Sequence, residues 1–193
     1  GVVASTKTST AATDYFRSKT TGNWNSTDTW ESSSNNTNWV QSTLVPSSSP
    51  TTVTILDGHI VSIDENVTVN SLILNSGSTL TINAGKQLTV NSTLSNSGTL
   101  NLLSDALGTA TILTPSSLSG NGGIYNVNQH LTYRTWYMSS PVASATPSGM
   151  GVIKYFDETV AGNTWTPTTT MTAGKGYFVT PIDDEDHISN ILF

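Results

Sequence analysis

The chain is acidic and sparsely charged: of its 193 residues only 10% are charged, the formal net charge is −6 and the pI is near 4.7. Its seven Lys and Arg residues are scattered and form no basic stripe, which excludes nucleic acid as a partner. The sequence has no Cys, which excludes disulfides, thiol catalysis and Cys-type zinc sites. No apolar run approaches the length of a membrane span, so we expect no membrane insertion.

Residues 1–13 are rich in Ser, Thr and Ala, a composition typical of a flexible leader. No signal peptide begins this sequence, and we expect that one has been removed. The following segment is rich in turn residues and carries three of the five Trp residues: Trp24, Trp30 and Trp39. We predict that these rings form an N-terminal cap, because a stack of repeats must have its open end covered.

A repeat of about twenty residues is visible between positions 51 and 127, where apolar and polar side chains alternate. The apolar pairs fall into three columns that recur every 19 to 22 residues: Val53/Leu72, Val61/Leu80/Leu100 and Val67/Leu88/Ala110. This pattern predicts an all-β fold, a right-handed parallel β-helix of about four coils whose stacking buries one continuous core. A β-sandwich of short strands is the alternative, although its strands have no reason to keep register in three columns.

Short turns that end in glycine separate the predicted strands. They are Asn75-Ser76-Gly77, Asn83-Ala84-Gly85, Asn96-Ser97-Gly98 and Asn121-Gly122-Gly123. We predict a positive φ at these glycines, because tight corners between strands favour that conformation. The predicted β-helix with its cap therefore covers residues 14–128.

The pattern changes after Asn128 to longer and more aromatic strands, which predict a small antiparallel β module over residues 129–193. We expect this module to be truncated, because the sequence ends on an apolar, strand-like segment. Five aromatic residues of the module are candidate ligand-binding residues, since sugar rings stack on the flat faces of Trp and Tyr. They are Trp136, Tyr137, Tyr155, Trp165 and Tyr177. The alternative is that they form the core of the module. If any of them are exposed, we expect the pair Tyr137 and Trp165.

Two stretches of the chain resemble a known group of proteins. The first, FRSKTTGNWNSTDTWE at Phe16–Glu31 with the VTI, DGH and VSI segments within 53–63, resembles the start of β-helical repeats in secreted Bacteroidetes surface proteins. It is more distantly similar to the eight-glycine domain. The second, TWYMSSPV, NTWTP and GKGYFVTP in turn, resembles the module that follows such repeats. The resemblance covers most of residues 14–181 and implies a secreted or cell-surface protein of the adhesin type.

The carboxylates of the repeat region are the first candidates for catalysis, because polysaccharide lyases and hydrolases are often β-helices. A glycosidase needs two facing carboxylates, and a lyase needs a carboxylate-bound calcium ion with a basic residue. The region offers only a scattered set: Asp57, Asp64, Glu65, Asp105 and Lys86. We therefore predict that the chain has no catalytic residue and is not an enzyme.

Metal ligands are sparse in the sequence as well. His59, His130 and His187 are far apart and none belongs to an H-x-x-x-H pair, so we expect no histidine metal site. The acidic run Asp183-Asp184-Glu185-Asp186 could offer oxygen ligands to calcium, but it lacks the alternating spacing and the glycine of a calcium loop. We interpret it as a solvated linker, and we expect no metal and no cofactor.

These features favour a non-catalytic structural or adhesive module of a secreted or cell-surface bacterial protein. Its expected partners are an extracellular glycan, a protein of a host or cell surface, and the rest of its own longer chain. Two alternatives stay open: a β-helical polysaccharide lyase or hydrolase, and a carbohydrate-binding module that serves a larger enzyme.

Overall fold

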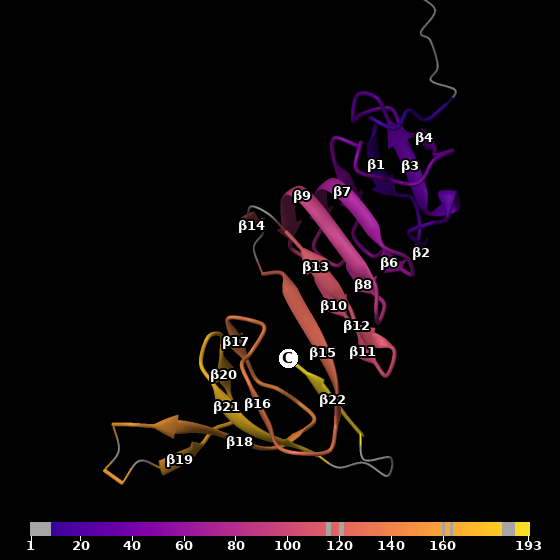
Figure 1. Cartoon of the computed structure of the whole chain (residues 1–193). Helices are drawn as coiled ribbons and strands as arrows, with labels where there is room; N and C mark the ends of the chain where they lie inside the picture. The colour runs from indigo at the N-terminus through magenta and orange to yellow at the C-terminus, as the bar shows by residue number, and fades with distance from the viewer. Residues whose placement is uncertain (1–8, 115–116, 120–121, 160, 163, 183–187) are drawn as a thin grey trace, which may run out of the picture.

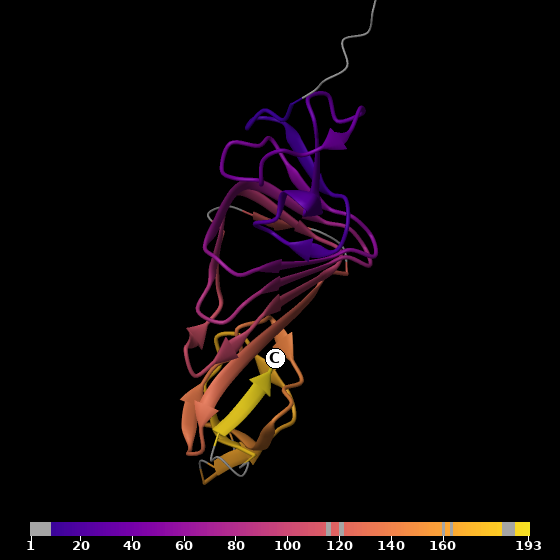
Figure 2. The same ribbon diagram turned by 90° about the vertical axis from the view of Figure 1, so that its right-hand side faces the viewer.

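The computed structural model describes residues 9–114, 117–119, 122–159, 161–162, 164–182 and 188–193. In these residues the fold is all-β, apart from one turn of 3-10 helix, η1 (Thr27–Thr29). Figures 1 and 2 show an elongated molecule with the N-terminal cap at one end, stacked coils in the middle and a second module at the other end. The predicted acidic run at 183–186 and His187 lie outside the described residues.

A parallel β-solenoid occupies the middle of the chain, as the repeat predicted. One of its sheets contains β5 (Val53–Ile55), β7 (Val67–Leu74), β9 (Gln87–Asn96), β13 (Thr111–Leu113) and β14 (Ser117–Ser119). The facing sheet contains β6 (Ile60–Ile63), β8 (Thr79–Ile82), β10 (Thr99–Leu102) and β15 (Ile124–Thr132). The solenoid makes about three turns rather than four, because the last coil is incomplete and the chain leaves it along β15.

The observed register confirms most of the predicted columns. Val61, Leu80 and Leu100 lie side by side in three parallel strands, and all three are fully buried. Val53 pairs with Leu72, and Val67 pairs with Leu88. Two predicted columns share one strand, because β7 and β9 bend at a register shift between Val69 and Ser71 and continue on the next side of the coil. Their inward side chains form one core along the solenoid.

The third column was predicted wrongly at its last member. Leu88 pairs with Ile112 and not with Ala110. A hairpin of β11 (Ser104–Asp105) and β12 (Gly108–Thr109) follows β10, and the Asp105 carboxylate accepts a hydrogen bond from the backbone amide of Leu107. The hairpin adds residues before the chain rejoins the sheet, so the pairing shifts by two positions. Ala110 is still buried in the core.

The N-terminal cap begins as a further parallel layer and ends as an antiparallel one. β1 (Tyr15–Ser18) and β2 (Gly22–Asn23) pair in parallel with β5 and β6, whereas β3 (Trp30–Ser33) and β4 (Val40–Gln41) add antiparallel strands. Trp24 and Trp30 are buried with their ring centroids 4.8 Å apart, as the cap required. Trp39 was predicted wrongly: it is half-buried, outside the core, with the Arg17 guanidinium 4.1 Å from its ring centroid.

The corner glycines serve two different purposes. Gly77, Gly85 and Gly122 have the predicted positive φ, at 77°, 70° and 75°. Gly98 and Gly123 do not, so that part of the prediction was wrong. A Cβ added at Gly98 would lie 2.5 Å from the Ser78 carbonyl oxygen, and this close approach to backbone explains the residue.

Replacement of Gly98 by alanine should therefore destabilise the solenoid. We expect a loss of about 1–3 kcal/mol, because the new methyl group would overlap a backbone carbonyl that the coils hold in place. The matched control is Gly176→Ala, where a Cβ would meet no atom within 4 Å. Guanidinium unfolding followed by circular dichroism measures both variants, and equal midpoints for the two would contradict the close-packing explanation.

The second module contains two antiparallel sheets. The larger has the strand order β16 (Trp136–Met138), β21 (Tyr177–Pro181), β18 (Met150–Asp157) and β19 (Thr164–Pro167). The smaller pairs β17 (Ser144–Ala145) with β20 (Met171–Thr172). β15 runs on from the solenoid and pairs with β22 (Ile188–Leu192), so the expected boundary at 128/129 falls inside a strand. A separate core of seven buried side chains holds this module together.

Candidate functional site

The four-stranded sheet of the second module has an inner face and an outer face. Side chains of Ile153, Tyr177 and Val179 point inward and are buried in the core of the module. Residues in the alternate positions of the same strands face outward, because successive side chains of a strand lie on opposite faces. Four aromatic rings meet on this outer face: Tyr137 of β16, Phe178 of β21, Phe156 of β18 and Trp165 of β19. We call them the aromatic face.

The rings of the aromatic face touch one another across the strands. Trp165 contacts each of the other three rings. Its ring centroid lies 5.5 Å from that of Phe156, 5.6 Å from that of Phe178 and 6.2 Å from that of Tyr137. Tyr137 also lies 5.9 Å from Phe178. The exposed fractions are 73% for Tyr137, 43% for Phe156 and 41% for Trp165. A sheet surface thus presents a contiguous set of rings to solvent, which is uncommon unless the surface binds something.

The predicted binding residues divide between the two sides of the sheet. Tyr137 and Trp165 lie together on the aromatic face, as the expected exposed pair. Tyr177 is buried, and its hydroxyl accepts a hydrogen bond of 2.9 Å from the Thr172 backbone amide. Tyr155 is half-buried and packs against the core of the module. These two contribute to stability, in line with the alternative that some of the five aromatic residues form the core.

Trp136 also points away from the aromatic face. It precedes Tyr137 in β16, pairs with the buried Val179, and its indole N–H donates a 3.1 Å hydrogen bond to the Thr132 carbonyl. The Arg134 guanidinium carbon lies 3.8 Å from the centroid of its ring. The side chain of Arg134 therefore covers one face of the Trp136 ring.

Sequence reasoning missed Phe156 and Phe178. The signal that could have found them is strand alternation, since Phe178 lies between the inward Tyr177 and Val179, and Phe156 follows the inward Tyr155. Only the pairing of the strands brings these two rings beside Trp165, because Phe156 is directly opposite Trp165 in the register of β18 and β19.

Charged groups of the second module are few. Lys154 lies on β18 directly opposite Phe178 and Pro167, on the side of the aromatic face. Lys175 places its ammonium 3.3 Å from the centroid of the Tyr155 ring. Hydrogen bonds from the hydroxyl and the backbone amide of Thr159 hold the pKa of Asp157 below its usual value, so this carboxylate is ionised at neutral pH.

Two carboxylates of the solenoid, those of Asp57 and Asp64, have structural partners at its corners. Both oxygens of Asp64 accept hydrogen bonds from side-chain amides, one from Asn23 and one from Asn83. Asp57 packs against Gly77 in the neighbouring coil, and Glu65 is exposed. The ring of His59 shares a 2.8 Å hydrogen bond with the Ser18 hydroxyl of the cap. In the described ranges no three His, Cys, Asp or Glu side chains are grouped so that they could hold a metal ion.

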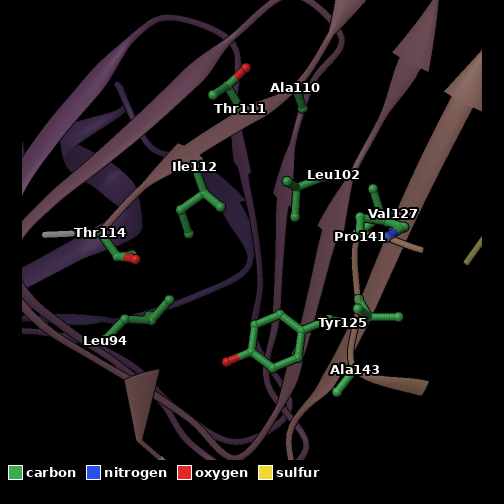
Figure 3. A pocket seen from close by; sticks show the side chains of 11 residues that line it. Leu94, Leu102, Ala110, Thr111, Ile112, Thr114, Tyr125, Val127, Pro141 and Ala143 are labelled. Atoms are coloured by element: carbon green, nitrogen blue, oxygen red, sulfur yellow. The ribbon is translucent and has the colours of Figure 1, made fainter. Parts of the chain in front are cut away.

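An apolar cavity of about 530 Å³ lies where the solenoid meets the second module (Figure 3). Leu94, Leu102 and Ile112 line it from the coils, and Val142 lines it from the second module. Figure 3 shows the Tyr125 ring reaching into it from β15. None of the described residues that line the cavity is acidic, basic or a histidine.

No family model, curated relative or solved structure matches this chain. The described part of the chain contains no helix with the length and apolar character of a membrane span. The fold and the candidate site together define a β-solenoid that carries an antiparallel module with an exposed aromatic face. Its function must be inferred from this geometry.

Proposed function

We propose that this chain is a non-catalytic adhesive module of a secreted or cell-surface protein and that its aromatic face binds glycan. The observation that carries the proposal is the contact of exposed Tyr137 and Trp165, with ring centroids 6.2 Å apart, on one face of the sheet. Rings held by a sheet lose little conformational freedom when they bind, and their flat surfaces suit the apolar faces of sugar rings.

The solenoid would then act as a spacer that holds the aromatic face away from the point of attachment. Each coil adds about 4.8 Å to its length, because neighbouring strands are separated by that distance. Its side chains are locked in a continuous core, which makes the spacer stiff. The resemblance to secreted Bacteroidetes surface proteins supports the same location outside the cell.

Replacement of Trp165 by alanine should weaken glycan binding strongly without unfolding the chain. The test is affinity electrophoresis through gels that contain plant, algal and host polysaccharides. We expect at least one polymer to retard the wild-type chain, and Trp165→Ala to weaken that interaction by about tenfold or more, because it removes the central stacking surface.

The matched control is Tyr133→Ala. Tyr133 is 44% exposed and lies in the bend between β15 and β16, outside the four-stranded sheet. The Tyr133→Ala variant should be retarded by the same polysaccharide as the wild-type chain. Circular dichroism should show that both variants keep their fold. Equal retardation of the two variants would rule out the aromatic face as the binding surface. Free migration in every gel would overturn glycan binding, and a zone of degraded polymer would overturn the non-catalytic assignment.

A further inference from the structure

Among the described residues of the four-stranded sheet, one cationic side chain, Lys154, lies on the aromatic face. In the register of the sheet, Tyr137 is opposite Phe178, Phe178 is opposite Lys154, and Lys154 is opposite Pro167. Directly opposed residues of an antiparallel sheet share a face, so Lys154 stands in a row with two of the rings. Phe156, two residues along the same strand, places a third ring beside it.

Lys154 differs from the other two cations of this module, because it has no partner among the residues that the structure describes. Arg134 covers the Trp136 ring, and Lys175 covers the Tyr155 ring. Within the described residues, the Lys154 ammonium makes no hydrogen bond, ion pair or ring contact. Lys154 is a half-buried residue on a largely apolar surface. An ammonium in such surroundings is well placed to pair with an anion, because removal of water strengthens the interaction.

No acidic side chain opposes Lys154 on the outer face in the described part of the sheet. Asp157 is opposite Thr164 and follows the inward alternation of Tyr155, so it lies on the other side. Glu158 comes after the end of β18. The outward positions of the four strands hold only aromatic, aliphatic, proline and threonine residues besides Lys154: Val152, Phe156, Tyr137, Phe178, Thr180, Trp165 and Pro167.

We propose that the aromatic face selects an acidic polysaccharide, whose sugar rings stack on Trp165 and Tyr137 while a carboxylate or sulfate group pairs with Lys154. This inference rests on the proposed glycan binding and adds the chemical class of the glycan. The whole chain opposes such a ligand at long range, because its net charge is −6. A preference for the acidic form of a polymer must therefore come from a local positive group.

Matched pairs of polymers test the inference. One pair is polygalacturonate and its methyl ester, which has the same backbone without the free carboxylate. The other is a sulfated galactan and its desulfated form, and the two pairs distinguish carboxylate from sulfate recognition. Affinity electrophoresis at one ionic strength gives the affinity for each polymer. We expect the wild-type chain to bind the acidic member of at least one pair about fivefold more tightly, as one partly exposed charge pair allows.

Variants of the two lysines test which residue causes the preference for the acidic polymer. The Lys154→Gln variant should bind the acidic polymer no more tightly than the neutral one. The Lys154→Arg variant, which keeps the positive charge, should keep the preference. Lys175, whose ammonium lies over the Tyr155 ring, supplies the control: Lys175→Gln should leave the preference for the acidic polymer unchanged. If the neutral and acidic members bind equally and Lys154→Gln changes neither, the acidic ligand is wrong while glycan binding stands. If no polymer binds, both proposals fail.

Discussion

Trp30→Ala should cost the chain about 3–5 kcal/mol of stability, the largest loss that we expect from one substitution. Trp30 is fully buried within the cap, and its ring packs edge-on against Trp24. Its indole N–H donates a 2.8 Å hydrogen bond to the Trp24 carbonyl, and the Trp24 indole donates to the Pro46 carbonyl at 3.1 Å. Truncation would remove a large apolar contact area and leave a buried carbonyl without its donor.

Trp39→Ala is the matched control for the cap. Trp39 is only half-buried and contacts the Arg17 guanidinium at the surface, so its loss should cost no more than about 1 kcal/mol. Guanidinium unfolding followed by far-ultraviolet circular dichroism compares the two variants without relying on tryptophan fluorescence. If both variants unfolded at the same denaturant concentration, Trp24 and Trp30 would not be the residues that close the solenoid.

Leu72→Ala should destabilise the solenoid by about 2–5 kcal/mol. Leu72 is fully buried in β7, between Val53 of the preceding coil and Leu94 of the next, so the cavity would open in the middle of the stack. In a solenoid each coil is stabilised by its neighbours, and a defect in a central coil weakens two interfaces at once.

The next residue in the chain supplies the control. Ile73 follows Leu72 in the same strand, points to the opposite face and is 36% exposed. Ile73→Ala should cost less than about 1 kcal/mol, since much of its apolar surface is already in contact with water. Unfolding by guanidinium measures both variants, and a larger loss for Ile73→Ala would contradict the assigned register of β7.

The aromatic face and the apolar cavity offer different chemistry for binding. The aromatic face combines flat exposed rings with one cation, which suits a polar ligand that has apolar faces. The described residues that line the cavity supply aliphatic side chains, three hydroxyl groups and one proline, and none of them carries a charge that could orient a ligand. The binding experiments therefore address the aromatic face first.

The twenty-residue repeat by itself determined the solenoid. Stacked coils give each inward position the same environment in successive turns, so Val61, Leu80 and Leu100 recur at a constant spacing and pair as the spacing predicts. The prediction was wrong where a local insertion intervened. Because the β11–β12 hairpin adds residues between the strands, Leu88 pairs with Ile112 and not with Ala110. A pattern of apolar residues does not reveal the length of such an insertion.

The second module shows what only the tertiary structure decided. The sequence identified five aromatic residues but did not assign them to the two faces, since that assignment depends on which strands pair and in what register. Pairing of β18 with β19 and β21 brought Phe156, Phe178 and Lys154 to Trp165 and left Tyr155 and Tyr177 on the other side. Contacts between successive coils recur at a constant spacing along the chain, so they can be predicted from the period. The aromatic face joins four strands by antiparallel pairings that follow no period, so it exists only in the folded sheet.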